Sequence, residues 1–498
     1  ALREIHQPSS EILIKTARYR LKWEELFFLQ LELLLRKGIQ NKKLKGYSFN
    51  EVGAAFNEFY QNHLPFELTN AQKRVLKEIR KDLGAGSHMN RLLQGDVGSG
   101  KTLVALLSLL LAIGNDLQGA LMAPTEILAT QHFIGISYLL GSMNISVALL
   151  TGSTKKAERV RIHEGLNNGD IQLLIGTHAL LEDTVQFKNL GLVVIDEQHR
   201  FGVAQRAKMW RKNTTPPHVL IMTATPIPRT LAMTFYGDLD VSVIDELPPG
   251  RKPIQTIHRR ENHRAKLFAF IQEQLQLGRQ AYVVYPLIQE SEKLDFKNLE
   301  DGYAQIEDFF KPNGFQISMV HGKMKPADKE AAMQAFVQGQ THIMVATTVI
   351  EVGVNVPNAS VMVIESAERF GLSQLHQLRG RVGRGAEKSF CILMTGDGIS
   401  KEAQKRMDTM VASNDGFVLA EVDLQLRGPG DLMGTQQSGA LALKIADLAR
   451  DGQLVQLARD KAREILESDP QLIKPENTLL NQALREVLKN KPNWGRIS

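Results

Sequence analysis

The sequence predicts an α/β protein whose chain builds two parallel sheets, one after the other, each covered by helices on both faces. Short apolar runs of strand length alternate with helix-length segments from about residue 64, which is typical of parallel strands joined by helical crossovers. This alternation occurs twice, and a Pro- and Gly-rich stretch at residues 247–253 separates the two runs. Both ends of the chain show helical periodicity instead.

The expected strands of the first run are residues 91–94, 119–123, 171–176, 192–196 and 219–223. Those of the second run are residues 281–286, 317–321, 343–347, 361–365 and 390–394. One helix is expected over residues 10–37, ended by Gly38, and another over 400–413, before an irregular Gly-rich segment at 415–439. We therefore divide the chain into a helical linker (1–62), two α/β domains (63–247 and 248–397) and a C-terminal extension (398–498).

The composition narrows the class of protein. The chain has 498 residues, of which 43% are hydrophobic and 23% charged, so several ordinary globular domains are expected. The net charge of +6 is compatible with a polyanionic partner but does not establish one. Cys391 is the only cysteine and cannot form an intrachain disulfide, which favours a cytoplasmic location. The longest apolar run, about residues 103–113, is too short to span a bilayer, so no membrane association is expected.

A phosphate-binding loop lies between the first expected strand and the helix that follows it. The glycines of such a loop let backbone N–H groups close around phosphate oxygens, and the helix N-terminus adds partial positive charge. Lys101 is expected to reach the β- and γ-phosphates, and the Thr102 hydroxyl to bind Mg²⁺. ATP and Mg²⁺ are therefore the predicted cofactors. The full motif consists of Gly95, Asp96, Val97, Gly98, Ser99, Gly100, Lys101 and Thr102.

Two carboxylates end the strand expected at residues 192–196. Asp196 can hold Mg²⁺, and Glu197 can polarise a water that attacks the terminal phosphate. By themselves, two acids at a strand end could be ordinary solvated side chains. Their position after a complete phosphate loop favours nucleotide hydrolysis.

Further segments resemble the motifs of superfamily-two helicases, so the fold implied is two tandem RecA-like P-loop domains. Gln198 and His199 complete a DExH-type tetrad with the two acids. The resemblance implies adenine recognition by a Q motif, in which a Gln amide matches N6 and N7 of the base, made of Phe66, Leu68, Thr69 and Gln72. It implies contacts to nucleic acid, or coupling to it, for Pro124, Thr125, Thr177, His178, His199, Thr223, Thr225, Thr347 and Thr348.

The second domain carries the counterparts of motifs V and VI. Motif V implies a nucleotide-binding role for Gly353 and Asn355, and motif VI a catalytic role for Gln377. Arg381 and Arg384 are spaced like the arginine fingers of motif VI, which stabilise charge on the transferred phosphate by roughly 4–7 kcal/mol. One ATP site between the two domains is therefore expected.

Longer stretches resemble one family more closely. DEQHRFGV at 196–203, TATPIPRT at 223–230, YGDLD at 236–240 and IDELPPGR at 244–251 are similar to RecG, a family of bacterial branch-migration DNA helicases. The resemblance covers essentially the whole chain. It implies an ATP-dependent helicase or translocase that moves on duplex DNA and drives branch migration and regression of stalled forks and Holliday junctions in recombination and repair. It also implies a monomer, with single-strand-binding protein as a further candidate partner.

The segment after motif VI looks like the translocation motif of this family, a helical hairpin followed by a loop. The resemblance assigns coupling to duplex DNA to Arg427, Gln436 and Gln437; the alternative is an ordinary Gly- and Pro-rich surface loop. The family carries a strand-splitting wedge domain ahead of its linker helix, whereas no all-β pattern precedes residues 1–6 here, and the sequence opens at what resembles the linker that follows the wedge. We therefore expect a fragment that keeps the motor and lacks the wedge.

Three other interpretations remain open from the sequence. A transcription-repair coupling factor shares the translocation motif, but a polymerase-binding segment is not visible in the sequence and residues 247–250 match RecG better. A DExH-type RNA helicase would share the core motifs without the hairpin. A nucleotide-binding scaffold without hydrolysis would leave Glu197 and the motif VI arginines without a role.

Overall fold

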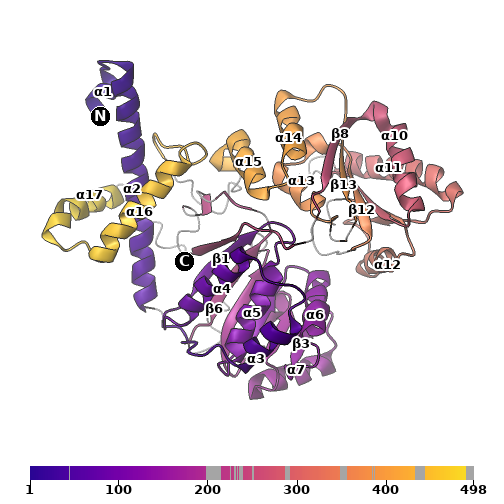
Figure 1. The fold of residues 1–498 in the computed structure, drawn as a ribbon, viewed down its shortest axis with the longest axis horizontal. Helices are drawn as coiled ribbons and strands as arrows, with labels where there is room; N and C mark the ends of the chain where they lie inside the picture. The colour runs from indigo at the N-terminus through magenta and orange to yellow at the C-terminus, as the bar shows by residue number, and fades with distance from the viewer. Residues whose placement is uncertain are drawn as a thin grey trace.

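The computed structural model describes residues 1–43, 45–197, 215–224, 226–228, 231–232, 234, 239–249, 252–286, 292–347, 356–383, 385, 387–431 and 443–489. For residues 39–43, 292–298, 326 and 427–431 it describes the backbone only. Two α/β bodies and a group of helices that joins both ends of the chain are visible in Figure 1. The two parallel sheets confirm the fold class that the sequence predicts.

The first sheet has seven parallel strands in the order β3-β4-β2-β5-β6-β1-β7. One face packs against α4 (Asn70–Leu83), α5 (Lys101–Ile113) and α6 (Glu126–Leu140), and the other against α7 (Lys156–Asn168). Because both faces are covered, the strands are apolar almost throughout. The strands are β1 (Asn90–Gly95), β2 (Gln118–Met122), β3 (Val147–Leu150), β4 (Leu173–Gly176), β5 (Leu190–Asp196), β6 (His218–Thr223) and β7 (Asp240–Ile244).

The second sheet has six parallel strands in the order β10-β11-β9-β12-β13-β8. One face packs against α10 (Arg264–Gln276) and α11 (Glu292–Phe310). The other packs against α12 (Pro326–Val337), α13 (Leu372–Arg379), α14 (Lys401–Ala412) and α15 (Gly416–Asp431). The strands are β8 (Gln255–Arg260), β9 (Gln280–Val284), β10 (Ile317–Val320), β11 (Ile343–Ala346), β12 (Ala359–Ile364) and β13 (Phe390–Thr395).

Helices from the two ends of the chain pack against each other. After α1 (Leu2–His6), the long α2 (Glu11–Lys43) shares an apolar cluster with α16 (Gly452–Ser468) and α17 (Thr478–Lys489). Figure 1 shows the backbones of α2 and α16 crossing each other. Inside this cluster the Arg459 guanidinium donates to Gln30 Oε1 at 2.9 Å. The remaining short elements are α3 (Ala54–Glu58), η1 (Phe59–His63), η2 (His178–Leu181), η4 (Glu261–His263), η6 (Lys311–Asn313), η8 (Ala367–Arg369) and η9 (Pro475–Asn477).

Two expected helix limits are wrong. Gly38 does not end the first helix, since α2 continues to Lys43. An exposed glycine costs a helix only about 1 kcal/mol, which a long helix packed elsewhere tolerates. The segment expected to be irregular from residue 415 begins as the helix α15. The Asp415 carboxylate accepts the Phe417 N–H at 2.8 Å, and the buried Leu419 and Leu424 hold the helix on its neighbours.

Three strands were not expected from the sequence, namely β3, β7 and β8. β3 has four residues and is mostly half-buried, so its hydrophobic signal is short. β7 and β8 are the edge strands on one side of their sheets, and the pattern of β8 is dominated by polar and basic residues. Within the described part of the chain, none of the helices is long and apolar enough to cross a membrane.

Candidate nucleotide site between the two sheets

The phosphate loop has the shape that its glycines predict. β1 ends at Gly95, and the loop turns through Gly98 and Gly100, whose φ angles are 78° and 83°. A side chain is strained in this left-handed region, which favours glycine there. A Cβ at Gly95 would come within 2.5 Å of Ser99 Oγ, so the loop also needs glycine for space. α5 begins at Lys101, directly after this turn.

The donors of the loop are poised for an anion. Lys101 is 8% exposed, and its Nζ donates to the backbone carbonyls of Gly95 at 2.7 Å and Asp96 at 2.8 Å. Ser99 Oγ is buried and has no hydrogen-bond partner among the described residues. A tight glycine turn, a helix N-terminus and a lysine beside it fit the phosphates of a nucleotide.

The Q-motif residues are attached to this loop. Thr69 caps α4: its Oγ1 accepts the Gln72 N–H at 3.2 Å, and its own N–H donates to Gln72 Oε1 at 2.9 Å. Gln72 Nε2 then donates to the Ser99 carbonyl at 2.9 Å. The Gln72 amide is fully buried, whereas Phe66 is 39% exposed and Leu68 is buried. Gln72 therefore links α4 to the phosphate loop.

The two carboxylates lie at the carboxyl end of β5. Asp196 Oδ2 contacts His132 Nε2 of α6 at 2.8 Å, and its Oδ1 accepts the Glu197 N–H at 3.0 Å. Sequence reasoning missed His132, whose buried neighbours on α6, Ala129, Ile136 and Leu140, are all apolar. Glu197 has a φ of 53°, a conformation that non-glycine residues rarely adopt and that often marks a functional site.

The pKa of Glu197 depends on charged residues of both domains. Burial raises the pKa of Glu197 to about 7, and the charge of Asp196 adds to the rise. Lys101 from the phosphate loop and Arg381 from the second domain lower it in turn. The charge of Arg381 is therefore felt at the carboxylate of the first domain. Gln377, on α13, is half-buried.

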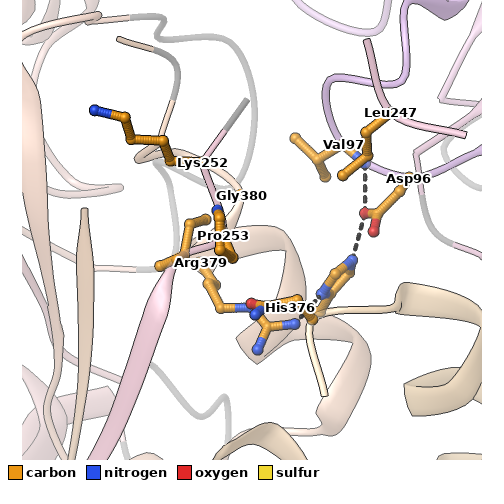
Figure 2. A pocket seen from close by; sticks show the side chains of 10 residues that line it. Asp96, Val97, Leu247, Lys252, Pro253, His376, Arg379 and Gly380 are labelled. Atoms are coloured by element: carbon orange, nitrogen blue, oxygen red, sulfur yellow. Dashed lines mark hydrogen bonds and ion pairs between the residues drawn. The ribbon is translucent and has the colours of Figure 1, made fainter. Parts of the chain in front are cut away.

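A direct contact between the domains involves two residues that sequence reasoning did not select. His376 Nε2 lies 2.5 Å from Asp96 Oδ1 of the phosphate loop, and Arg379 Nη2 donates to His376 Nδ1 at 2.9 Å. Figure 2 shows these three side chains, with His376 between Asp96 and Arg379. They line a cavity of about 40 Å³. Both new residues are within motif VI or directly before it, so their position in the motif was the available signal.

The described residues expected to couple to nucleic acid lie at the carboxyl ends of strands. Pro124 and Thr125 follow β2, and Thr125 Oγ1 caps α6 by accepting the Leu128 N–H at 3.3 Å. Parallel sheets bind their ligands at this edge. The others are Thr177 and the exposed His178 after β4, Thr223 at the end of β6, and Thr347 after β11.

Several expected site residues lie outside the described residues. They are His199, Thr225, Thr348, Gly353, Asn355, Arg384, Gln436 and Gln437, and for Arg427 only the helical backbone is described. Within the described residues, there is no group of three or more His, Cys, Asp or Glu side chains that could hold a metal ion. Thr102 and Asp196 offer two oxygen donors. That number suits Mg²⁺, which takes its other ligands from phosphates and water.

Family models match three parts of the chain. They are a DEAD/DEAH box helicase over residues 69–234, a helicase conserved C-terminal domain over 264–386, and ATP-dependent DNA helicase RecG, domain 3, C-terminal, over 413–498. The ATP-dependent DNA helicase RecG of Bacillus subtilis (strain 168) is 48% identical over 484 residues, which are 97% of this chain and 70% of that protein. The chain belongs to the RecG family.

Other RecG proteins give the same result. The ATP-dependent DNA helicase RecG of Synechocystis is 51% identical over 472 residues, which are 95% of this chain and 56% of that protein. A solved structure, "Structure of RecG bound to three-way DNA junction", matches with a TM-score of 0.73 and 43% identity, over 91% of this chain and 59% of that one. The chain therefore spans 56 to 70% of the length of the two curated relatives. RecG membership and the paired helicase domains confirm the resemblance found in the sequence.

Proposed function

We propose that this chain is an ATP-dependent motor that moves on duplex DNA and drives branch migration of forks and Holliday junctions. The observation that carries the proposal is that Asp96 of the phosphate loop lies 2.5 Å from His376, directly before the motif VI arginines of the second domain. The charges of Lys101 and Arg381 both lower the pKa of Glu197, in agreement with this geometry. Phosphate-binding, base and arginine groups thus converge from two domains on one place. Neither domain holds the complete set.

The residues of the first domain prepare the hydrolytic step. Lys101 exchanges two carbonyl partners for phosphate oxygens, and Glu197, with a pKa near 7, accepts a proton from the attacking water close to neutral pH. Thr102 and Asp196 are the residues that would hold Mg²⁺. When bound, ATP would supply the phosphoryl group that is transferred to water, and Mg²⁺ would neutralise the charge on that group.

The residues of the second domain complete the site. Arg381 stabilises the charge that develops on the transferred phosphoryl group, and Arg384 is proposed for the same role. Because one chain supplies both Lys101 and Arg381, a second subunit is not needed for this site, which supports a monomer. We place the domain limits at 63–247 and 248–397, supported by sheets that span residues 90–244 and 255–395.

Branched DNA is the proposed substrate because the RecG structure that this chain resembles is described as bound to a three-way DNA junction. The carboxyl edges of both sheets form the proposed backbone contact, through the half-buried Thr125 and the exposed His178. Thr177 and Thr347 are buried at these edges. Such contacts are mainly to phosphates, so sequence specificity is not expected. We also propose a contact with single-strand-binding protein. A cytoplasmic location is proposed because the chain keeps Cys391 as a free, buried thiol.

The test is the ATPase rate at fixed salt without nucleic acid and with linear duplex DNA, a model fork, single-stranded DNA or RNA. Stimulation by duplex DNA or the fork, with RNA inactive, is the expected result. Displacement of a triplex-forming strand from linear duplex by the same protein would show movement. Stimulation by RNA with duplex DNA inactive would contradict the proposal and leave only a general helicase assignment.

A further inference from the structure

His132 is a polar residue at a core position of the first domain. The buried residues of α6, which recur at intervals of three and four, form one face of the helix and are Ala129, His132, Ile136 and Leu140. Ile136 and Leu140 belong to the apolar core between this face and the sheet. The His132 side chain is therefore withdrawn from water with them, and its ring nitrogens need hydrogen-bond partners inside the protein.

The partner of this imidazole is the carboxylate at the end of β5. His132 Nε2 lies 2.8 Å from Asp196 Oδ2, across 64 residues of sequence. An ionised carboxylate can only accept hydrogen bonds, so Nε2 carries the hydrogen and donates it. His132 and Asp196 are 8% and 9% exposed, so solvent competes little for this bond and its direction is well defined.

The Asp196 carboxylate is held through both of its oxygens. Oδ2 accepts from His132, and Oδ1 accepts the Glu197 N–H at 3.0 Å. One donor on each oxygen fixes the plane of the carboxylate. A carboxylate offers about four acceptor sites, so these two bonds leave roughly two sites for a cation or its water ligands. Asp196 thus loses rotational freedom but keeps the capacity to bind a metal ion.

The helix that carries His132 is anchored at its start. Thr125 Oγ1 caps α6 by accepting the Leu128 N–H at 3.3 Å. Glu126, the first residue of the helix, accepts the Ser153 N–H at 3.1 Å and the Ser153 hydroxyl at 2.8 Å. A side chain on a fixed helix holds its partner more precisely than one on a loop, so His132 presents Nε2 at a defined place beside β5.

Two other roles fit the contacts of His132 less well. Mg²⁺ prefers oxygen ligands, so an imidazole is a poor direct ligand for it. A general base needs a ring nitrogen that can accept a proton from the attacking water, whereas Nε2 already donates to Asp196. The contact instead orients a carboxylate, and carboxylates that bind metal ions commonly depend on such a hydrogen bond from a residue behind them.

We propose that His132 is a positioning residue that orients the Asp196 carboxylate for Mg²⁺ in the ATP site. Without its hydrogen bond the Asp196 side chain can rotate, and metal binding must then restrict a group that His132 restricts in advance. Loss of the bond therefore weakens metal binding. It leaves the metal-free affinity for nucleotide unchanged, because the phosphate loop does not include α6. The inference rests on the proposed function, in which Asp196 helps to hold Mg²⁺.

The test measures how much a metal ion strengthens nucleotide binding. The affinity for a non-hydrolysable ATP analogue is determined with saturating Mn²⁺ and again in EDTA, and the ratio of the two affinities is the metal gain. His132→Phe keeps a ring in the buried face but has no donor, whereas His132→Gln places an amide donor near the position of Nε2. His132→Phe should lower the metal gain about tenfold, and His132→Gln should recover part of the loss.

The matched control is His88→Gln. His88 is a histidine of the same domain that is 7% exposed, and its Nε2 contacts the Pro217 carbonyl at 2.9 Å, before β1 and so at the opposite edge of the sheet. Its metal gain should equal that of the parent. An unchanged metal gain in His132→Phe would overturn the proposal. Loss of analogue affinity in EDTA by the same variant would show a general structural role and would overturn it as well.

The Mg²⁺ dependence of the ATPase rate separates positioning from catalysis. His132→Phe should raise the Mg²⁺ concentration at half-maximal rate about tenfold, while the rate at saturating Mg²⁺ stays within about threefold of the parent. A lower maximal rate with an unchanged Mg²⁺ dependence would contradict the positioning role. A parent whose ATPase does not respond to DNA would refute the proposed function, and the metal gain would still decide the role of His132.

Discussion

Apart from the additional edge strand β7 of the first sheet, the two sheets have the same strand order, but the charged residues at one equivalent position are arranged differently. In the order of the second sheet, β8 to β13 take the places of β1 to β6. The helix after the first strand begins at Lys101 in one domain and at Arg264 in the other, and both helices have 13 residues. The strand that carries Asp196 corresponds to β12, which is followed by Glu365.

The second domain neutralises its own charges at this position. Arg264 Nη1 and Nη2 donate to Glu365 Oε1 and Oε2 at 2.8 and 2.9 Å, a bidentate pair with a buried carboxylate. In the first domain Lys101 Nζ donates to the backbone carbonyls of Gly95 and Asp96 within the phosphate loop, and its charge lowers the pKa of Glu197. The same position of the fold therefore has two uses. In the second domain, Arg264 and Glu365 form an ion pair that stabilises the structure. In the first domain, Lys101 donates to the phosphate loop and contributes to the nucleotide site.

The largest effect is expected from removal of Arg381, the arginine of the second domain whose charge lowers the pKa of Glu197 in the first. Arg381→Ala should lower the rate of hydrolysis by about 10³–10⁵, because the charge on the transferred phosphoryl group loses its partner. Affinity for an ATP analogue should stay near the parent value, since the phosphate loop lies in the first domain. Lys101→Ala should instead lose nucleotide binding. Single-turnover phosphate release and analogue titration measure the two effects, and a common defect in both variants would contradict this division of roles.

Glu197→Gln tests the base at the end of β5. The amide keeps the size of the side chain but cannot accept the proton of the attacking water, so hydrolysis should fall by about 10²–10⁴ while the nucleotide still binds. Phosphate release compared with nucleotide affinity is the measurement. Turnover at the parent rate would show that Glu197 is not the base, despite its pKa of about 7.

Arg264→Ala breaks the ion pair that occupies the corresponding place in the second domain. Because it leaves the buried Glu365 carboxylate without its partner, it should destabilise that domain by about 3 kcal/mol. Arg264→Ala combined with Glu365→Gln should recover much of the loss. Hydrogen exchange of β12 and α10 would report the change, with β1 and α5 as the internal control. Equal loss in both sheets would argue against a local structural pair.

The last test concerns a histidine of the first sheet, whose effect on stability is absent at neutral pH and develops only as the pH falls. His218 is fully buried, accepts the Met89 N–H at Nδ1 and donates from Nε2 to the Tyr47 carbonyl. Burial lowers its pKa from 6.5 to about 4. The unfolded chain therefore binds more protons between these values, and stability from this residue is complete above pH 6.5 and lost as pH falls toward 4.

The loss at His218 amounts to about 3 kcal/mol at most. Hydrogen exchange of β6 against pH measures it, and His218→Gln should flatten the slope. The second sheet gives the comparison, since burial also lowers the pKa of His258, but this residue is only partly buried and hydrogen-bonds to Thr395 Oγ1. A slope at β8 as steep as that at β6 would contradict the burial argument.

Much of the candidate site could be predicted because its motifs are continuous in the chain. The phosphate loop, Asp196 with Glu197, and Arg381 were each recognised from consecutive residues, and the strands next to them were apolar enough to be expected. The polar edge strand β8 and the helix α15, which contains Gly428 and Pro429, gave no such local signal. Both are formed through packing against neighbours that local propensity does not include.

The sequence by itself determined the family, the two-sheet fold class and the identity of the phosphate loop, since these depend on short runs of residues in a fixed order. Only the tertiary structure decided which side chains meet. His132 reaches Asp196 across 64 residues, Arg264 reaches Glu365 across 101, and His376 reaches Asp96 across 280. Hydrogen bonds require atoms within about 3 Å, and only the folded path of the chain brings such distant residues to that distance.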